Sequence, residues 1–241
     1  MKSFTKVLTA IMLMTAMLFT VGCKKDKVEN NVEEPGGGNG TYNDHDYVDL
    51  GLPSGLLWAT CNVGADNSED YGGYFAWGET EPKTVYEWST YQHCNGNHDQ
   101  LTKYCSDSNY GYNDFTDNLT ILLPEDDGAT ANWGSGWRIP TYEDWIELFQ
   151  NTTVTWVTQN GENGLLFVAS NGNNLFLPAA GCRLDSDVSS SCNYGNYWSS
   201  SLNTGQPDEA WYFCFDSDGH YMNNGLRNYG QSVRPVCSAQ N

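Results

Sequence analysis

The sequence predicts an α+β protein built on a mostly antiparallel sheet. Short runs of β-branched and aromatic residues, separated by Gly, Pro, Asn and Asp, recur through the chain, whereas one segment alone has strong helical periodicity. The candidate helices precede most of the strands, and this segregation is typical of α+β domains. With 14% aromatic residues, 25 glycines and 17% charged residues, the composition is that of an extracellular β-rich domain with long ordered loops.

The first 22 residues are predicted to be a signal peptide. Lys2 and Lys6 precede an apolar run, 7–21, which is too short to cross a bilayer comfortably and is followed by Gly22-Cys23. A small residue directly before a cysteine resembles a bacterial lipobox, in which Cys23 is acylated and becomes the mature N-terminus. An ordinary signal peptide with a coincidental cysteine is the alternative. We therefore expect an exported protein that is lipid-anchored to the cell envelope at the outer membrane. The sequence does not predict which leaflet of that membrane holds the anchor.

The remainder of the chain divides into a linker and one domain. Residues 23–41 combine mixed charge with Pro35 and a glycine run, which predicts a flexible tether. Residues 42–241 show no internal repeat and no second linker, so we expect them to form a single domain.

The strong acidity of the chain restricts its partners. Two of the 11 basic residues lie in the signal segment, so nine remain against 30 acidic residues. Nucleic acid and anionic lipid are therefore disfavoured. Divalent cations, or neutral sugars held by carboxylates, amides and aromatic faces, fit better. The alternative is that the acidity only keeps an exposed protein soluble.

The densest motif, WGSGWRIPTYEDWIELF at 133–149, contains the main predicted helix, 141–150. Thr141 is expected to be its N-cap, and Asp144 is expected to reach back to the backbone N–H of the cap residue. From Trp145 onward, apolar residues recur at i, i+3 and i+4 and give the helix one apolar face.

The other elements are short. A second helix is predicted over about 125–132, and 79–124 is predicted to be a long surface excursion. Asn171-Gly172 is the strongest hairpin signal. About eight strands are expected from nine candidate runs: 47–50, 56–63, 71–78, 153–157, 165–170, 174–178, 197–200, 210–215 and 231–236.

Six stretches, in this order, resemble a known family: 47–65, 74–80, 133–149, 176–181, 197–201 and 232–236. They resemble the major paralogous domain first noted in Fibrobacter succinogenes and found in Bacteroidetes lipoproteins, and the related C-terminal domain of bacterial collagen-like adhesins. The resemblance implies a C-type-lectin-like fold with a surface or adhesion role and no established reaction. The structural residues of these motifs are Trp137, Arg138, Pro140, Thr141, Asp144, Trp145 and Arg234.

An enzymatic alternative comes from WRIPTYEDW at 137–145, which also looks like a signature of formylglycine-generating-type domains. The Gly/Ser/Arg-rich context of that enzyme's cysteine pair is missing around Cys214 and Cys237. We therefore assign no catalytic residue and expect a protein that is not an enzyme. Arg138 and Arg234 are expected to be paired to carboxylates or carbonyls as structural ties.

Seven cysteines besides Cys23 predict disulfides in an exported protein. The preferred local pairs are Cys94–Cys105 and Cys182–Cys192. Cys61–Cys237 is expected because the family resemblance places the first and last strands side by side, with Cys214–Cys237 as its rival. The alternative for His93, Cys94, His98 and Cys105 is a zinc cluster, which an oxidising compartment disfavours.

Two loops are candidate calcium sites. Gln206-Pro207-Asp208-Glu209 looks like the QPD triplet of galactose-type C-type lectins, and hard oxygen ligands on a proline-stiffened loop suit calcium. The Trp-Asn-Asp partner of that triplet is missing, so an ordinary proline turn is the alternative. For Asp216 and Asp218, in DSDG, a tight hairpin turn is the alternative. No cofactor is otherwise indicated.

Aromatic residues in polar surroundings form a candidate ligand platform, because aromatic faces stack on sugar rings and loops carry most binding residues. These residues are Trp88, Tyr91, Tyr110, Tyr112 and Tyr194. The tryptophans of the strand patterns, Trp156 and Trp211 among them, are expected in the core. The predicted function is a lipid-anchored module that binds glycan or protein. A structural or assembly component of the envelope without a small ligand is the alternative.

Overall fold

A computed structural model describes residues 39–189 and 193–238. The chain divides into two units, Met1–Glu34 and Pro35–Asn241, and every described residue lies in the second. The predicted signal peptide, Cys23 and nearly all of the predicted tether therefore lie outside the described residues. Within the described ranges, no helix has the length and apolar character needed to span a membrane.

Short strands dominate the described part of the chain. The helical elements are η1 (Trp88–Thr90), η2 (Tyr112–Asp114), η3 (Pro124–Asp126), α1 (Gly128–Trp133) and α2 (Tyr142–Gln150). The strands are β1 (Gly40–Tyr42), β2 (His45–Asp49), β3 (Leu56–Ala59), β4 (Trp137–Arg138), β5 (Thr152–Gln159), β6 (Glu162–Ala169), β7 (Asn174–Pro178), β8 (Cys182–Leu184), β9 (Asp187–Ser189), β10 (Gly195–Leu202), β11 (Glu209–Phe215), β12 (His220–Leu226) and β13 (Val236–Ser238).

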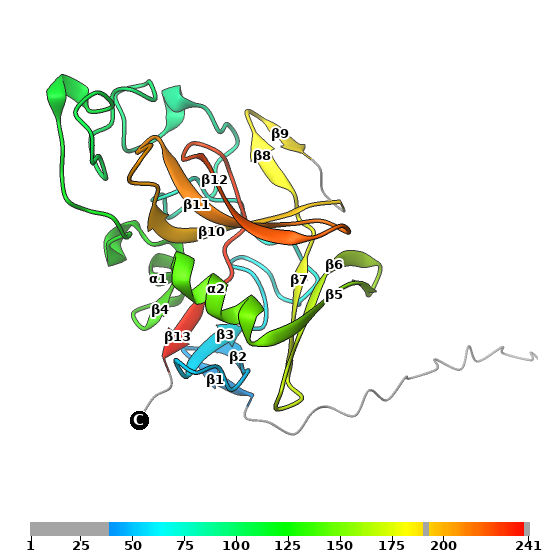
Figure 1. The fold of residues 1–241 in the computed structure, drawn as a ribbon. Coiled ribbons are helices and arrows are strands. Elements are labelled where there is room, and N and C mark those ends of the chain that lie inside the picture. Colours follow the sequence, from blue (N-terminus) through cyan, green and yellow to red (C-terminus); the bar gives the residue numbers. More distant parts are fainter. Residues whose placement is uncertain (1–38, 190–192, 239–241) are drawn as a thin grey trace, which may run out of the picture. The chain divides into compact units, whose positions relative to one another are not determined.

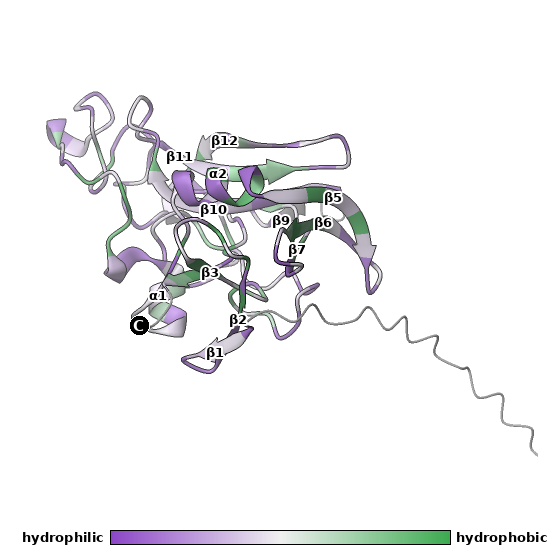
Figure 2. Ribbon diagram, turned by 60° about the horizontal axis from the view of Figure 1, so that its bottom comes forward, coloured by the Kyte–Doolittle hydropathy of each residue, from purple (hydrophilic) through white to green (hydrophobic). Residues whose placement is uncertain are grey.

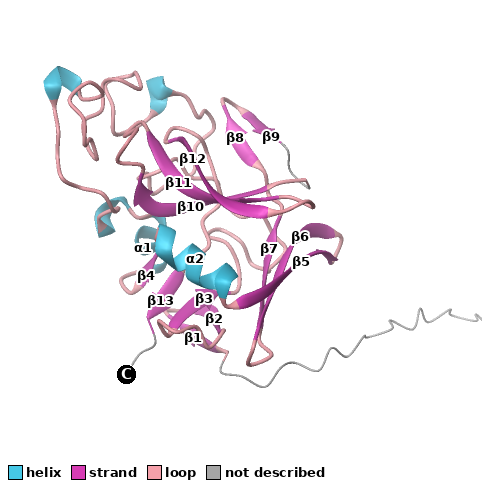
Figure 3. Cartoon of the chain, viewed as in Figure 1, coloured by secondary structure: helices cyan, strands magenta, loops and turns pink. Residues whose placement is uncertain are grey.

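The strands form separate antiparallel sheets, which confirms the predicted α+β class with mostly antiparallel pairing (Figures 1 and 3). One sheet has the order β1-β2-β3-β13-β4, a second is β5-β6-β7, a third is β10-β11-β12, and β8-β9 is a hairpin. The last strand, β13, pairs with β3. The last strand is therefore the neighbour of the strand predicted over 56–63, whereas the first strand, β1, pairs with β2.

Helix α2 is the main helix, as predicted, and it is capped as predicted. The Thr141 hydroxyl accepts from Asp144 N, and the Asp144 carboxylate accepts from Thr141 N at 2.7 Å. Trp145, fully buried, stacks on Phe213 of β11 at 4.9 Å and also contacts Trp58 of β3. The helix therefore joins two sheets through one buried indole ring.

Helix α1 confirms the predicted second helix but begins later than expected. The acidic run forms η3, and Asp127 then caps α1 by accepting from Ala129 N and Thr130 N. The other carboxylate oxygen of Asp127 accepts from Ile139 N at 2.8 Å. The residue expected inside the helix is therefore its cap, and it ties α1 to the segment that precedes α2.

Two predicted strands are wrong, and five observed strands were not predicted: β1, β4, β8, β9 and β12. In 71–78 only Phe75 makes a bridge, to Gln231, because the loop packs its rings inward instead of pairing in a ladder. In 231–236 the strand begins only at Val236. The longest of the unpredicted strands is β12, and its HYMNNGL sequence lacks the apolar alternation that would reveal it.

The excursion over 79–124 is present, and most of its residues are hydrophilic (Figure 2). It is fixed to the rest of the domain by Arg227, which is fully buried. The Arg227 guanidinium lies 4.9 Å from the Trp77 ring and 5.3 Å from the Tyr91 ring. It donates to the Tyr91 hydroxyl and to the carbonyl oxygens of Lys103, Tyr104 and Pro207.

Both predicted arginine ties are confirmed. Arg138 Nη1 lies 2.6 Å from the Asp144 carboxylate. Arg234 is fully buried and donates to the Asn62 side-chain oxygen and to the carbonyl oxygens of Ala59 and Thr60.

The predicted disulfides that fall on described residues are wrong, because Cys61, Cys94, Cys105, Cys182, Cys214 and Cys237 are free thiols. Cys94 Sγ donates to Trp88 O at 3.2 Å, whereas Cys105 Sγ donates to Asp107 O at 3.1 Å. Cys237 pairs with Leu57 of β3, four residues before Cys61. Strand β3 ends at Ala59, so Cys61 lies beyond the ladder that holds Cys237 and is not its cross-strand neighbour. Cys192 lies outside the described residues.

Removal of the Arg227 guanidinium is expected to destabilise the fold strongly. Arg227→Met leaves three interior carbonyl groups without donors, so we expect a loss of at least about 3 kcal/mol in the free energy of unfolding. Arg183 is half-buried, and its guanidinium donates to Ser186 O at 3.4 Å. The control Arg183→Met is expected to cost about 1 kcal/mol or less. Urea unfolding of both variants measures the difference, and equal losses would contradict it.

Candidate functional site

A polar groove with a volume of ≈ 460 Å³ lies where two sheets come together. Strands β5 and β6 form one side, and the start of β10 and the β11–β12 turn form the other. The residues that line it are Trp156, Asn163, Asn193, Tyr194, Asp216, Ser217 and Asp218. We call this site the polar groove.

Two aromatic residues of the polar groove are anchored to the domain, one by packing and one by a backbone hydrogen bond. Trp156 is half-buried, packs against the main hydrophobic cluster and meets the Phe215 ring edge-on at 6.3 Å. Tyr194 is 43% exposed, while its backbone carbonyl accepts from Gly181 N at 2.7 Å. Trp156 therefore presents a ring with a fixed base, and Tyr194 presents an exposed ring on a fixed backbone, which suits a stacking ligand.

The two aspartates of the polar groove belong to a hairpin turn, as the alternative to a calcium loop predicted. One oxygen of Asp216 accepts from Asp218 N at 2.8 Å and from Gly219 N at 3.0 Å. Asp216 N donates to Gly219 O, which closes the turn between β11 and β12. The Asp218 carboxylate is exposed and accepts a hydrogen bond from the Ser217 hydroxyl at 3.5 Å.

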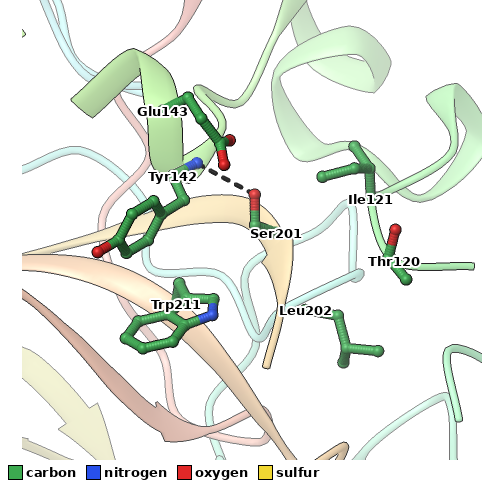
Figure 4. Close-up of a pocket in the computed structure, with 7 residues that line it drawn as sticks. All are labelled: Thr120, Ile121, Tyr142, Glu143, Ser201, Leu202 and Trp211. Atoms are coloured by element: carbon green, nitrogen blue, oxygen red, sulfur yellow. Dashed lines mark hydrogen bonds between the residues drawn. The ribbon is translucent and has the colours of Figure 1, made fainter. Parts of the chain in front are cut away.

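A second site, which we call the α2 cleft, lies beside the first turn of α2 and has a volume of ≈ 260 Å³ (Figure 4). Its lining residues are Thr120, Ile121, Tyr142, Glu143, Ser201, Leu202 and Trp211. The Tyr142 and Trp211 rings meet edge-on at 5.0 Å, and Tyr142 N donates to the Ser201 hydroxyl at 3.0 Å. The wall opposite α2 is fixed because Leu202 N donates to Thr120 O.

The predicted aromatic platform is not one surface. Tyr91 is buried, and its hydroxyl donates to Trp77 O at 2.6 Å and accepts from Arg227 Nε, so its assignment as an exposed residue is wrong. Trp88 is half-buried and packs edge-on against Tyr91. Tyr110 is half-buried, Tyr112 lies exposed on η2, and of the five predicted residues Tyr194 alone lines one of the two sites.

The carboxylates of the QPD-like loop have different partners and do not converge on one point. The Asp208 carboxylate is buried and lies 3.5 Å from His98 Nδ1. Glu209, at the start of β11, accepts instead from the Asn203 and Asn224 amides, and Gln206 is exposed. Burial raises the pKa of both carboxyl groups. Calcium at this loop stays a prediction.

The zinc alternative finds no geometric support in the described ranges, where no group of three or more His, Cys, Asp and Glu side chains is placed to hold a metal ion. His93 and Cys94 point to different partners. His93 Nε2 lies 2.7 Å from Gly78 O, and Cys94 Sγ donates to backbone carbonyls.

A buried polar network lies next to Arg227. The Asp126 carboxylate accepts from Lys103 Nζ and from the Tyr104 hydroxyl, each at 2.5 Å. The Tyr104 hydroxyl in turn accepts from Leu123 N at 2.9 Å. Lys103 is the network member with partial exposure, and nothing in it faces either cleft. We therefore interpret the network as structural.

The sequence identified Tyr194, Asp216 and Asp218 but not the rest of either site. Trp156 and Trp211 were assigned to the core because they lie in strand patterns, whereas both are half-buried at the ends of packed faces. Asn163 and Asn193 come from distant parts of the chain. The available signal was the position of Trp156 among threonines in β5, a pattern of an outward-facing strand surface.

Acidification is expected to destabilise the protein through His93. Burial lowers the pKa of His93 below 6.5, with Asp126 and Lys103 as its charged neighbours besides Arg227. The unfolded chain then binds more protons as the pH falls below 6.5, so stability is complete above that pH and is lost below it. We expect the free energy of unfolding to fall between about pH 7 and about pH 5, and His93→Gln to reduce this loss.

The control is Thr102→Gln, because Thr102 is exposed and the exchange removes no titratable group. It should keep the wild-type pH dependence. Chemical unfolding at a series of pH values measures all three proteins, and an unchanged slope in His93→Gln would show that other groups cause the loss.

Comparison with known proteins gives one family. A family model for a domain of unknown function, DUF8237, matches residues 156–236, less than half of the chain. The matched stretch begins at Trp156, and every lining residue of the polar groove lies within it. No curated protein and no solved structure matches the chain.

Proposed function

We propose that this chain is an exported, lipid-anchored envelope protein whose folded part binds glycans in the polar groove. One observation carries the proposal: two ring faces, Trp156 and Tyr194, stand beside four amide or carboxylate side chains in one open site. Aromatic faces stack on the apolar faces of sugars, and amides and carboxylates hydrogen-bond to their hydroxyl groups. A volume of ≈ 460 Å³ lies in the range of small-molecule sites.

The charge of the polar groove selects among glycans. Asp216 and Asp218 supply two carboxylates, and no Lys, Arg or His side chain lines the described groove. A sugar that carries its own carboxylate or sulfate would meet like charge. Neutral sugars and amino sugars are therefore the proposed ligands, and acidic polysaccharides are the excluded class.

We infer further that the fold is C-type-lectin-like. The pairing of β13 with β3, one main helix between sheets and the long excursion over 79–124 support this inference. The Gly22-Cys23 motif supports the lipid anchor. Export is consistent with the acidic, aromatic-rich composition.

Loss of an aromatic face should weaken glycan binding. We expect Trp156→Ala and Tyr194→Ala each to raise the Kd for a neutral oligosaccharide at least about tenfold, as the truncation of an aromatic anchor does at a buried contact. Asp218→Ala should weaken binding as well. A neutral ligand is first chosen on a glycan array, and the Kd values are then measured by calorimetry.

Tyr112→Ala is the matched control, because Tyr112 is 41% exposed and lies on η2, outside the groove. Trp156 also packs against the core, so the melting temperature of the Trp156→Ala variant is measured in parallel. Tyr194 is exposed, so Tyr194→Ala reports on glycan binding without a loss of core packing. An array without neutral ligands, or equal weakening by Tyr112→Ala, would count against the groove.

The proposed lipid anchor is tested by removing the Cys23 thiol. Cys23→Ser is expected to abolish incorporation of labelled palmitate and to move the protein from the membrane fraction to the soluble fraction. Cys61→Ser should leave both properties unchanged, because Cys61 lies in the folded part. Retention of the label in Cys23→Ser would refute the anchor while leaving glycan binding open.

A further inference from the structure

The α2 cleft combines an acidic wall with apolar surfaces. The Glu143 side chain is exposed on the first turn of α2, and in the described part of the chain it makes no hydrogen bond or ion pair. Opposite it, Ile121 is 42% exposed, one of the few large apolar side chains at the surface of the described residues. Trp211 and Leu202 complete the apolar part (Figure 4).

The fixed geometry of the cleft makes it a preformed site. Leu122 N donates to Ser200 O and Leu202 N donates to Thr120 O, so the wall that carries Ile121 is paired to β10. The Ser201 hydroxyl accepts from Tyr142 N and holds the first turn of α2 against the same strand. Both walls therefore keep their spacing without a ligand.

We propose that the α2 cleft docks an arginine or lysine side chain of a protein partner. The methylene stem of such a side chain packs against Ile121 and Trp211, while its cationic head meets the Glu143 carboxylate. A guanidinium group also stacks on aromatic faces such as that of Trp211. The net charge of −19 favours a basic partner over an acidic one at long range.

The charges around the cleft disfavour an anion as its occupant. A helix N-terminus attracts anions through its free N–H groups, but two of the first three in α2, Tyr142 N and Asp144 N, already donate to hydroxyl groups. The nearby cation, Arg138, is neutralised by Asp144 at 2.6 Å. The exposed Glu143 carboxylate is thus the charge that an incoming ligand meets.

This docking site is independent of the polar groove. Trp211 and Phe215 lie on the same face of β11, and four strand residues separate them by about 13 Å. Phe215 supports Trp156 of the polar groove, and α2 covers Phe213 between the two. A glycan in one site and a basic side chain in the other can therefore succeed or fail separately.

The test titrates the purified mature chain with N-acetyl-arginine methylamide and follows amide and indole signals by NMR. We expect millimolar ligand to shift the signals of Glu143, Ser201 and Leu202 and of the Trp211 indole, with an affinity that falls as salt is added. The citrulline analogue, uncharged but of similar shape, should bind more weakly. Glu143→Gln should raise the Kd about threefold or more, as loss of an exposed charge pair does.

Asp99→Asn is the matched control, because it removes one exposed carboxylate elsewhere and should leave the Kd unchanged. Ile121→Ser should weaken both ligands by the same factor, since it alters only the packing of the stem. Equal binding of arginine and citrulline, no effect of Glu143→Gln, or no shift at all would overturn the proposal. Tighter binding after Lys24, Lys25 and Lys27 are changed to Gln would assign the cleft to the chain's own lysines and would also overturn it.

Discussion

The arrangement of the loops depends on the burial of one guanidinium group. Arg227 follows β12 and lies among the rings of Trp77, Tyr91 and Tyr104, which belong to the excursion over 79–124 or border it. Its N–H groups are paired with one hydroxyl and three carbonyl oxygens instead of a carboxylate. A planar donor with fixed directions can hold several loop carbonyls at once, whereas an apolar side chain of the same size cannot. The excursion therefore needs no disulfide to keep its position.

The packing of α2 on β11 explains why the two sites lie at the two ends of that strand. Helix α2 has nine residues and is about 14 Å long, whereas β11 has seven residues and extends about 23 Å. Trp145 and Phe149 cover Phe213 at the middle of β11. The strand ends project beyond the helix, so Trp211 and the neighbour of Phe215, Trp156, keep one open face each.

Local chemistry in the sequence predicted what local interactions determine. The Thr141 cap, the Asp144 reach-back and the Asn171-Gly172 hairpin follow from residues within a few positions of one another, and the structure contains all three. Arg227 carried no such signal, because its partners are more than 100 residues away in the chain, apart from Pro207. The polar groove likewise joins residues from β5, β6, β10 and the turn after β11, and only three-dimensional packing brings them together.

The distribution of charge connects the fold with the proposed ligands. Of the six basic residues in the described part, Lys83, Lys103 and Arg138 pair with carboxylates, while Arg227 and Arg234 are buried against carbonyl groups. Five of these six cations thus have their partners inside the domain, and most acidic residues of the described part have no basic partner. Each open site consequently presents carboxylates, two in the polar groove and one in the α2 cleft. A ligand that supplies hydroxyl or cationic donors satisfies them, and an anionic ligand would have to bring its own counter-charge.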